Sequence, residues 1–230
     1  MIRVLLVDDD ALVRSGLRLM LGGAADLEVV GEAADGGEVG ALVTACRPDV
    51  VLMDIRMPVI DGIMAAEALR RRPQPPEIIM LTTFNTDEHV LRALRAGAAG
   101  FVLKDTSPQE IVDAIRKVAA GDPVLSPEVT HQLIAQVSGG THSRATRARE
   151  QFGALSERER RVAVSVGQGR SNAEIAAQLF ISTTTVKTHV SRILTKLDLN
   201  NRVQIALLVH DAGESLGGRV GRVGGAETLG

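Results

Sequence analysis

The chain has 230 residues with a hydrophobic fraction of 45%, which is enough for the cores of one or two globular domains. Its apolar runs fall far short of the roughly 20 residues that cross a bilayer, and its single cysteine excludes an intramolecular disulfide, so we expect a cytoplasmic protein without a membrane span. The net charge of −2 is divided unevenly: residues 1–125 contain 13 Lys and Arg against 19 Asp and Glu, whereas residues 152–211 contain 8 against 5. A basic second half is compatible with a polyanionic partner.

The first 125 residues alternate between short apolar runs and longer amphipathic segments. Strands are predicted at residues 2–7, 28–33, 50–53, 77–82 and 100–103, and helices at residues 11–21, 36–46, 61–71, 87–97 and 107–121. Strict alternation with connections of this length predicts an α/β domain over residues 1–125, built on a five-stranded doubly wound parallel sheet.

The remaining chain is predicted to contain a linker, a smaller all-α domain and a tail. Residues 126–151 combine a short helix after Ser126 with a polar, Arg-containing stretch that we expect to be mobile. Residues 152–211 have purely helical patterns. The Gly-rich residues 212–230 are expected to be disordered.

Polar side chains stand at the ends of four predicted strands. Asp8 and Asp9 follow the first strand, Asp54 the third, Thr82 ends the fourth, and Lys104 follows the fifth. In a doubly wound sheet these positions meet at one edge, where ligands bind. Packed carboxylates repel one another unless a cation lies among them, and hard oxygen ligands favour Mg²⁺. With a lysine and a threonine to hold phosphate oxygens, the set is suited to phosphoryl transfer to a carboxylate.

A plainer role exists for any single one of these acids. An Asp after a strand often only caps the next helix, and we favour that role for Asp10 or Asp61. Capping does not explain the whole set, because all of its members stand at the ends of predicted strands: Asp8, Asp9, Asp54, Thr82 and Lys104.

These residues also carry a family resemblance. The segments VLLVDDDALVRSGL, PDVVLMDIRMPVIDG, IIMLTTF and ALRAGAAGFVLKD resemble the receiver domain of bacterial two-component response regulators, over nearly all of residues 1–125. The resemblance implies a flavodoxin-like fold in which Asp54 accepts a phosphoryl group from a sensor histidine kinase. It further implies Mg²⁺ ligands and phosphoryl contacts: Asp8, Asp9 and Asp54 for the metal, Thr82 and Lys104 for the phosphoryl group.

The aromatic residue near the last strand has two interpretations. Phe101 occupies the position of the switch aromatic of the family, which turns inward as Thr82 moves toward the phosphate. From the residues alone, a plain core aromatic is an equal alternative for Phe101.

The helical domain contains a predicted helix-turn-helix. Helices at 171–180 and 182–198 are joined by a tight turn, with Ser171 or Asn172 capping the first and Ser182 the second. Residues with helical apolar spacing form its predicted core: Leu155, Val162, Val166, Ile175, Leu179, Val186, Val190, Ile193, Leu194 and Leu197.

The opposite face of residues 182–198 is hydroxyl-rich and positive, which suits a DNA major groove, although a merely solvated face is an equal alternative. Its members are Thr184, Lys187, Thr188, Ser191 and Thr195, and candidates for phosphate contacts are Arg192, Lys196 and Arg202.

A second resemblance covers most of residues 152–211. LSERERRV and GRSNAEIAAQLFISTTTVKTHVSRILTKLDLNNRVQ closely resemble the DNA-binding domain of LuxR-type regulators, and together with a receiver they indicate the NarL/FixJ family of response regulators. The resemblance implies a helix-turn-helix from Asn172 to Ser191 with Lys187, Thr188 and Ser191 facing the groove. It also implies a last helix, Arg202 to His210, that serves dimerisation, and an unphosphorylated receiver that can cover the recognition helix.

We therefore predict a transcriptional regulator that phosphorylation of Asp54 switches and that binds double-stranded promoter DNA as a homodimer. One alternative is a phosphorylation-independent DNA-binding regulator whose receiver serves only for dimerisation. An enzyme with an Asp nucleophile is another, but such enzymes need a second acid two residues later, where this chain has Arg56. We expect no enzymatic activity beyond self-catalysed phosphoryl transfer and hydrolysis.

Overall fold

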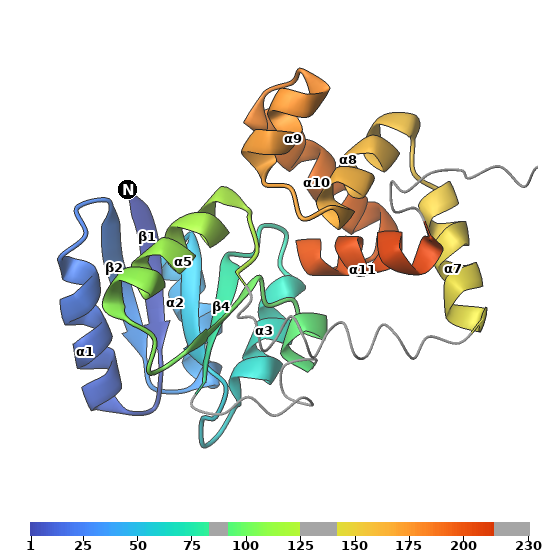
Figure 1. The fold of residues 1–230 in the computed structure, drawn as a ribbon. Coiled ribbons are helices and arrows are strands. Elements are labelled where there is room, and N and C mark those ends of the chain that lie inside the picture. Colours follow the sequence, from blue (N-terminus) through green and yellow to red (C-terminus); the bar gives the residue numbers. More distant parts are fainter. Residues whose placement is uncertain (83–91, 125–141, 214–230) are drawn as a thin grey trace, which may run out of the picture.

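A computed structural model describes residues 1–82, 92–124 and 142–213, which form a sheet domain (residues 1–124) and a helical domain (residues 142–213) (Figure 1). The sheet contains β1 (Ile2–Val7), β2 (Leu27–Ala33), β3 (Val50–Asp54), β4 (Glu77–Thr82) and β5 (Gly100–Leu103). All neighbouring strands are parallel, and their order is β2-β1-β3-β4-β5. The predicted five-stranded doubly wound sheet is confirmed.

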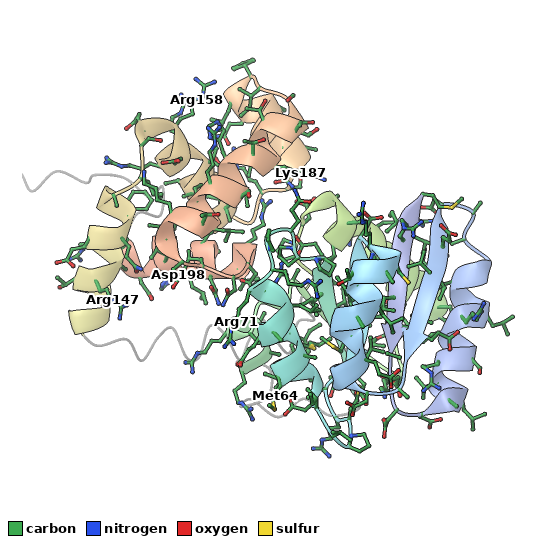
Figure 2. All side chains as sticks on the ribbon, turned by 180° about the vertical axis from the view of Figure 1, so that it is seen from behind. Met64, Arg71, Arg147, Arg158, Lys187 and Asp198 are labelled. Atoms are coloured by element: carbon green, nitrogen blue, oxygen red, sulfur yellow. The ribbon has the colours of Figure 1, made fainter. Side chains whose placement is uncertain are left out.

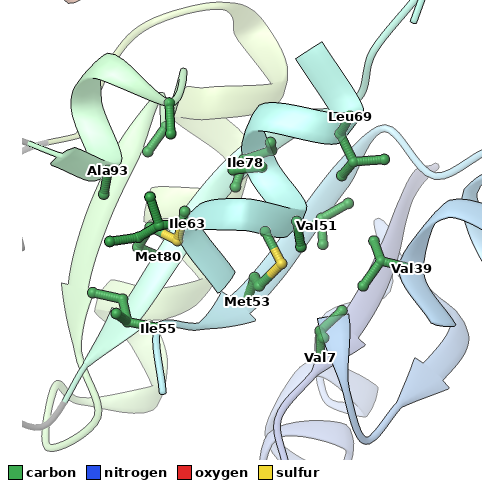
Figure 3. Close-up of a cluster of buried hydrophobic side chains, with 14 of the residues drawn as sticks. Val7, Val39, Val51, Met53, Ile55, Ile63, Leu69, Ile78, Met80 and Ala93 are labelled. Carbon is green, nitrogen blue, oxygen red and sulfur yellow. The ribbon is translucent and has the colours of Figure 1, made fainter. Parts of the chain in front are cut away.

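Helices cover both faces of this sheet because its central strand, β3, has buried apolar side chains on both sides. Alternate residues of a strand point to opposite faces. Thus Leu52 belongs to a core cluster with α1 (Ala11–Gly22) and α5 (Pro108–Ala120). Its neighbours Val51 and Met53 belong to the opposite cluster, with α2 (Gly36–Cys46) and α3 (Gly62–Arg70). Figure 3 shows the side chains of this second cluster.

Polar caps fix where the helices of the sheet domain begin and end. Asp10 caps α1 and Asp61 caps α3, as predicted for these two acids. Ser107 and Glu110 form a capping box at the start of α5, and Gly121 ends that helix in the left-handed conformation. The predicted helix at 87–97 lies partly outside the described residues, but residues 92–95 are helical.

The helical domain contains α7 (His142–Gly153), α8 (Glu157–Gly167), α9 (Asn172–Leu179), α10 (Thr183–Leu197) and α11 (Arg202–Ala212). All ten residues predicted for its core belong to one cluster or pack against it. Ser171 caps α9 and Ser182 caps α10, which decides between the two capping residues considered for α9.

One segment differs from the predicted linker. Residues 142–153 form α7, and its Ala148 and Phe152 are buried in the core of the helical domain. Two apolar side chains four residues apart lie on one helix face, so even this polar stretch can pack. The predicted helix after Ser126 falls outside the described residues, and so does most of the tail predicted to be disordered, residues 212–230. That prediction was wrong for the first two residues of the tail, because Ala212 ends α11 in the core of the helical domain and Gly213 caps the helix.

Within the part of the chain that the structure describes, no helix has both the length and the apolar character needed to cross a membrane.

Candidate functional site

The polar side chains predicted at the sheet edge come together in the structure. Lys104 Nζ lies 2.6 Å from Asp8 Oδ2 and 3.1 Å from Asp54 Oδ2. Thr82 is buried at the end of β4, and its carbonyl accepts the Lys104 backbone N–H at 2.9 Å. The strand order explains this meeting, because β1, β3, β4 and β5 are neighbours whose carboxyl ends share one edge.

The loop after β3 holds the end of that strand in place. The N–H of Gly62, the first residue of α3, donates to Ile55 O at 2.9 Å, and a Cβ on Gly62 would lie only 2.1 Å from Asp54 O. Asp35 reaches across from the start of α2 and accepts the backbone N–H groups of Val59 and Ile60 at 3.0 and 3.2 Å. The backbone next to Asp54 is therefore tightly constrained. No local pattern in the chain indicated the part that Asp35 plays.

Burial and neighbouring charges shift the pKa values of Asp54 and Lys104 in opposite directions. Burial raises the pKa of the Asp54 carboxyl, because loss of hydration disfavours the ionised form, and the contact with Lys104 only partly offsets this effect. Burial also acts to lower the pKa of Lys104, but its contacts with Asp8 and Asp54 together outweigh burial and raise it. Lys104 is therefore a stable cation between two carboxylates.

The acidic residues have the chemistry of a divalent-cation site. Asp8, Asp9 and Asp54 each offer a carboxylate oxygen, and these three atoms lie within 4.8 Å of one another. Asp8 Oδ2 is buried, and although Lys104 Nζ is close to it, no donor among the described residues meets it with hydrogen-bond geometry. Asp9 is exposed. Hard oxygen donors with one open side fit Mg²⁺, which keeps several of its waters.

Phe101 lies inside the sheet domain. Its side chain is buried in the cluster that also contains Met80 and Ala93. This position agrees with a core aromatic, and the switch role of Phe101 stays a prediction.

The predicted groove face of α10 is present as a surface. Val186, Ile193 and Leu197 are buried in the core of the helical domain. The side chains expected on the opposite face are exposed: Thr184, Lys187, Thr188, Ser191 and Thr195. Among the predicted phosphate contacts, Arg192 is exposed, whereas Lys196 donates to Glu159 Oε2 at 3.2 Å.

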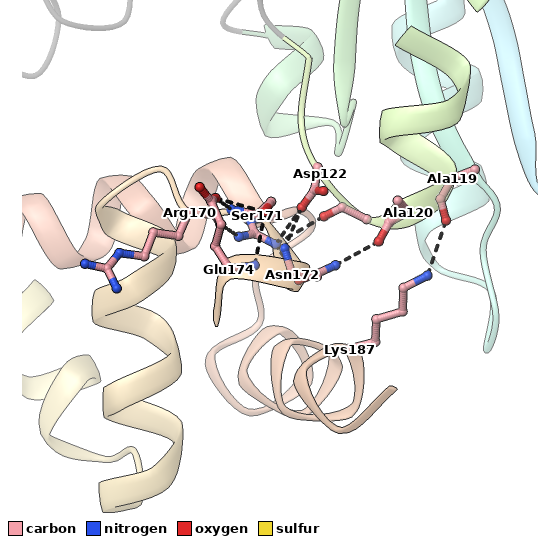
Figure 4. A network of polar contacts seen from close by, with 10 residues as sticks. Ala119, Ala120, Asp122, Arg170, Ser171, Asn172, Glu174 and Lys187 are labelled. Atoms are coloured by element: carbon pink, nitrogen blue, oxygen red, sulfur yellow. Dashed lines mark hydrogen bonds and ion pairs between the residues drawn. The ribbon is translucent and has the colours of Figure 1, made fainter. Parts of the chain in front are cut away.

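The end of α5 meets α9 and α10 in a row of polar contacts (Figure 4). Lys187 Nζ donates to Ala119 O at 3.4 Å, and Asn172 Nδ2 donates to Ala120 O at 2.8 Å. The backbone N–H of Asn172 donates to Asp122 Oδ1 at 3.0 Å. Figure 2 likewise shows Lys187 where the two domains meet. The sheet domain thus contacts the predicted groove face at Lys187, although this side chain stays exposed.

Arg202 takes part in the same contact between the domains. This residue is 8% exposed, and its Nη1 donates to Asn172 Oδ1 at 2.6 Å, to Gly121 O at 3.3 Å and to Asp122 Oδ1 at 3.4 Å. Its Nη2 donates to Arg170 O. Burial lowers the pKa of Arg202, and the charge of Asp122 opposes that effect. In this arrangement Arg202 is unavailable to solvent, so the predicted phosphate contact is not free to form.

The first turn of α11 is docked on the sheet domain. Val203 is buried in a core cluster of that domain, with Leu207 packed beside it. Asn201 caps α11 with its Oδ1, while its Nδ2 donates to Leu94 O at 2.7 Å and to Ala98 O at 2.8 Å. The helix predicted for dimerisation therefore packs, at its start, against the same chain.

The roles of Asp122, Asn172 and Asn201 at this contact could not be predicted from the sequence. Their partners are between 50 and 107 residues away along the chain, and no local pattern marks such pairs.

Comparisons with known proteins agree with both domains. The family model of the response regulator receiver domain matches residues 4–116, and the model of bacterial regulatory proteins of the luxR family matches residues 153–209. The transcriptional regulatory protein LiaR of Bacillus subtilis is 40% identical over 210 residues, which cover 91% of this chain and 97% of LiaR.

Two solved structures extend the likeness. The response regulator ChrA of a haem-sensing two-component system has 38% identity and a TM-score of 0.50, with 91% of this chain and 96% of that chain covered. The isolated receiver of RcsB from Salmonella enterica serovar Typhimurium, solved in the presence of the phosphomimetic BeF₃⁻, has 25% identity and a TM-score of 0.52, over 57% of this chain and 97% of that one.

Proposed function

The chain belongs to the NarL/FixJ family of response regulators, and from that premise we propose that phosphorylation of Asp54 by a sensor histidine kinase controls its binding to promoter DNA. Its two domains are those of a DNA-binding transcriptional regulator. The observation that carries the proposal is the position of Lys104 Nζ between Asp8 and Asp54, at 2.6 and 3.1 Å. Two carboxylates and one ammonium group from three strand ends thus share one small site, which is the set of groups that phosphoryl transfer to a carboxylate needs.

The proposed reaction is a phosphoryl transfer to a carboxylate. A carboxylate oxygen of Asp54 forms a bond to phosphorus while the phosphorus–nitrogen bond of the kinase phosphohistidine breaks, which leaves an acyl phosphate on Asp54 and a free histidine. Water later attacks the phosphorus and releases inorganic phosphate. LiaR is named a transcriptional regulatory protein, and we propose that this acceptance and hydrolysis are the only chemistry of the chain.

The other site residues have distinct parts in this proposal. Asp8, Asp9 and Asp54 would hold Mg²⁺, which neutralises phosphoryl oxygens when bound. Lys104 loses one of its two carboxylate partners when Asp54 is modified, and its ammonium is then available to a phosphoryl oxygen. Thr82 would move toward the phosphoryl group and donate its hydroxyl hydrogen to another phosphoryl oxygen. The buried Phe101 would change position in response.

The output side of the proposal is DNA binding by α10. Its exposed face would enter the major groove, with Lys187, Thr188, Ser191 and Thr184 near the bases and Arg192 and Lys196 on phosphates. A phosphorylated homodimer would bind two half-sites in the cytoplasm. Because α11 starts against the sheet domain, dimerisation through α11 requires that contact to open.

The proposal is tested by replacing the phosphoacceptor. Asp54→Asn should abolish phosphoryl uptake from a small acyl phosphate donor in the presence of Mg²⁺, because an amide cannot act as the nucleophile; intact mass measures uptake. Asp61→Asn is the matched control, since Asn caps a helix as well as Asp does. Uptake by Asp54→Asn at the rate of the unmodified chain would reject the assignment.

The DNA step needs its own measurement. Footprinting on a DNA fragment selected in vitro for binding to this chain, with and without beryllofluoride and Mg²⁺, should show protection that increases with the phosphoryl mimic. Equal affinity in both conditions would favour a phosphorylation-independent regulator, and steady turnover of a phosphate ester would favour an enzyme.

A further inference from the structure

A carboxylate of the sheet domain contacts the start of α9 and Arg202 in the helical domain. Asp122 Oδ1 accepts the N–H of Asn172, the first residue of α9, and lies 3.4 Å from Arg202 Nη1. A helix N-terminus carries unpaired N–H groups and a partial positive charge, and a guanidinium beside it adds a full one. This combination is what proteins use to bind phosphate groups.

The site is built within the helical domain and does not depend on Asp122 for its shape. Arg202 is 8% exposed, and Asn172 Oδ1 holds its Nη1 at 2.6 Å, with a further contact to Arg170 O. These two partners belong to the helical domain, so they remain when the domains separate. The bonds to the sheet domain are longer, at 3.3 and 3.4 Å, and the Asp122 side chain is 24% exposed. The Arg202 guanidinium is thus oriented by its own domain before any anion binds, and another anion can replace Asp122.

The neighbouring contacts have the same polarity. Ala119 O, Ala120 O, Gly121 O and the Asp122 carboxylate are all acceptors, and each is met by a donor of the helical domain. A row of oxygen acceptors with a negative charge resembles the sugar-phosphate backbone of DNA, which accepts at least half of the hydrogen bonds in protein–DNA complexes. Lys187, on the predicted groove face, contacts one end of this row (Figure 4).

We infer that the N-terminus of α9 and Arg202 form a binding site for a DNA phosphate, and that Asp122 occupies this site when the domains are in contact. In helix-turn-helix proteins the first helix of the motif crosses the DNA backbone, which places the start of α9 beside a phosphate when α10 is in the groove. The inference rests on the proposed function, because it requires DNA on α10. DNA and the sheet domain then compete for the same donors.

The close approach of α5 to α9 depends on Gly121, the residue before Asp122. Gly121 has a φ of +87°, and a Cβ there would lie 2.8 Å from Asn172 Nδ2. Glycine therefore permits both the left-handed end of α5 and the contact that brings Asp122 onto α9.

The first experiment removes the competing carboxylate. The unphosphorylated full chain is titrated with a mixed-sequence DNA duplex at low salt, since phosphate contacts do not depend on sequence. Asp122→Ala should bind the duplex about tenfold more tightly than the unmodified chain, because the competing carboxylate is gone. A factor of about ten corresponds to the low end of the free energy of one hydrogen bond to a charged group. Asp122→Asn should be intermediate, because its amide oxygen still accepts a hydrogen bond. Glu38→Gln removes the same charge from an exposed position on α2 and should change affinity little.

The second experiment tests Arg202 after the competitor is gone. In the Asp122→Ala background, Arg202→Gln should reduce the slope of log K against log salt by about 0.9, the value for one phosphate. Arg202→Lys should keep most of the slope but bind less tightly, because it lacks the guanidinium fork. Circular dichroism checks that each variant is folded. If Arg202→Gln does not fold, the inference is tested with Arg202→Lys and the Asp122 variants alone.

The outcomes separate this inference from the proposed function. Tighter binding by Asp122→Ala together with the loss of slope supports the shared site. Equal DNA affinity of the unmodified chain, Asp122→Ala and Glu38→Gln would overturn the inference and leave the proposed function standing. An equal gain in Asp122→Ala and Glu38→Gln would also overturn it, because net charge would then account for the effect. Failure of every variant to bind any duplex would reject both.

Discussion

Replacing Gly62 by alanine is expected to damage the phosphoacceptor site through the backbone alone. The new Cβ would lie 2.1 Å from Asp54 O, 3.0 Å from Asp54 C and 3.2 Å from Ile55 Cα. Ordinary van der Waals contact begins near 3.4 Å, so the start of α3 or the end of β3 must move by more than 1 Å. Both segments are backbone held by hydrogen bonds, and no flexible side chain can give way.

The magnitude follows from known costs of overpacking. Extra methyl groups in a filled site destabilise by about 1–3 kcal/mol. For a domain of this size that corresponds to a decrease in the midpoint of thermal unfolding of roughly 5–10 °C. A misplacement of about 1 Å at a reacting group can slow the reaction by roughly 10²-fold. Gly62→Ala should therefore be less stable and should accept phosphate much more slowly.

A matched variant separates this effect from the general effect of alanine. Gly16 lies inside α1, and a Cβ there would meet nothing within 4 Å. Gly16→Ala should stabilise the sheet domain by about 0.5–1 kcal/mol, because alanine is the better helix former.

Calorimetry measures both variants. The transition of the sheet domain is identified by its upward shift when Mg²⁺ and beryllofluoride are added, since a ligand stabilises the state that binds it. Phosphoryl uptake from an acyl phosphate gives the rate. If Gly62→Ala unfolded at the same temperature as the unmodified chain and accepted phosphate within twofold of its rate, the steric reasoning would be refuted.

Two further predictions concern the helical domain. Lys187→Ala should weaken promoter binding by about 1–3 kcal/mol while phosphoryl uptake by Asp54 is unchanged, and unaltered footprints would remove Lys187 from the groove face. The backbone N–H and hydroxyl of Ser156 and the charge of Lys196 lower the pKa of Glu159, so its contribution to stability is complete above its ordinary pKa and is lost as pH falls through the lowered value. Glu159→Gln should reduce the unfolding midpoint of the helical domain near neutral pH and flatten its decrease in acid; an unchanged pH profile would contradict this.

Most of the fold could be predicted from local sequence patterns, because strands and helices depend on residues that are close together in the chain. Runs such as VVLM predict a strand buried on both faces, and the structure divides Val51 and Met53 from Leu52 between two opposite core clusters. The positions of Asp8, Asp54 and Lys104 after their strands were equally predictable, since parallel strands in a doubly wound sheet end at one edge. The ion pairs among them follow from that rule.

Patterns were less informative where only two side chains decide the packing. The stretch that becomes α7 is polar and was expected to be a linker, yet Ala148 and Phe152 are enough to attach it to the core of the helical domain. Arg202 was a candidate for a phosphate contact, but the fold buries it among hydrogen-bond acceptors from both domains.

The sequence by itself determined the two domains, the strand ends that carry the acidic site and the exposed face of α10, because periodicity, capping and turn residues act over a few positions. Only the tertiary structure decided that α11 begins against the sheet domain and that Asp122 lies at the start of α9. The physical reason is that these contacts join residues 50 or more positions apart through a few hydrogen bonds and the buried Val203, and such pairs depend on how complete surfaces fit and leave no periodic pattern in the chain.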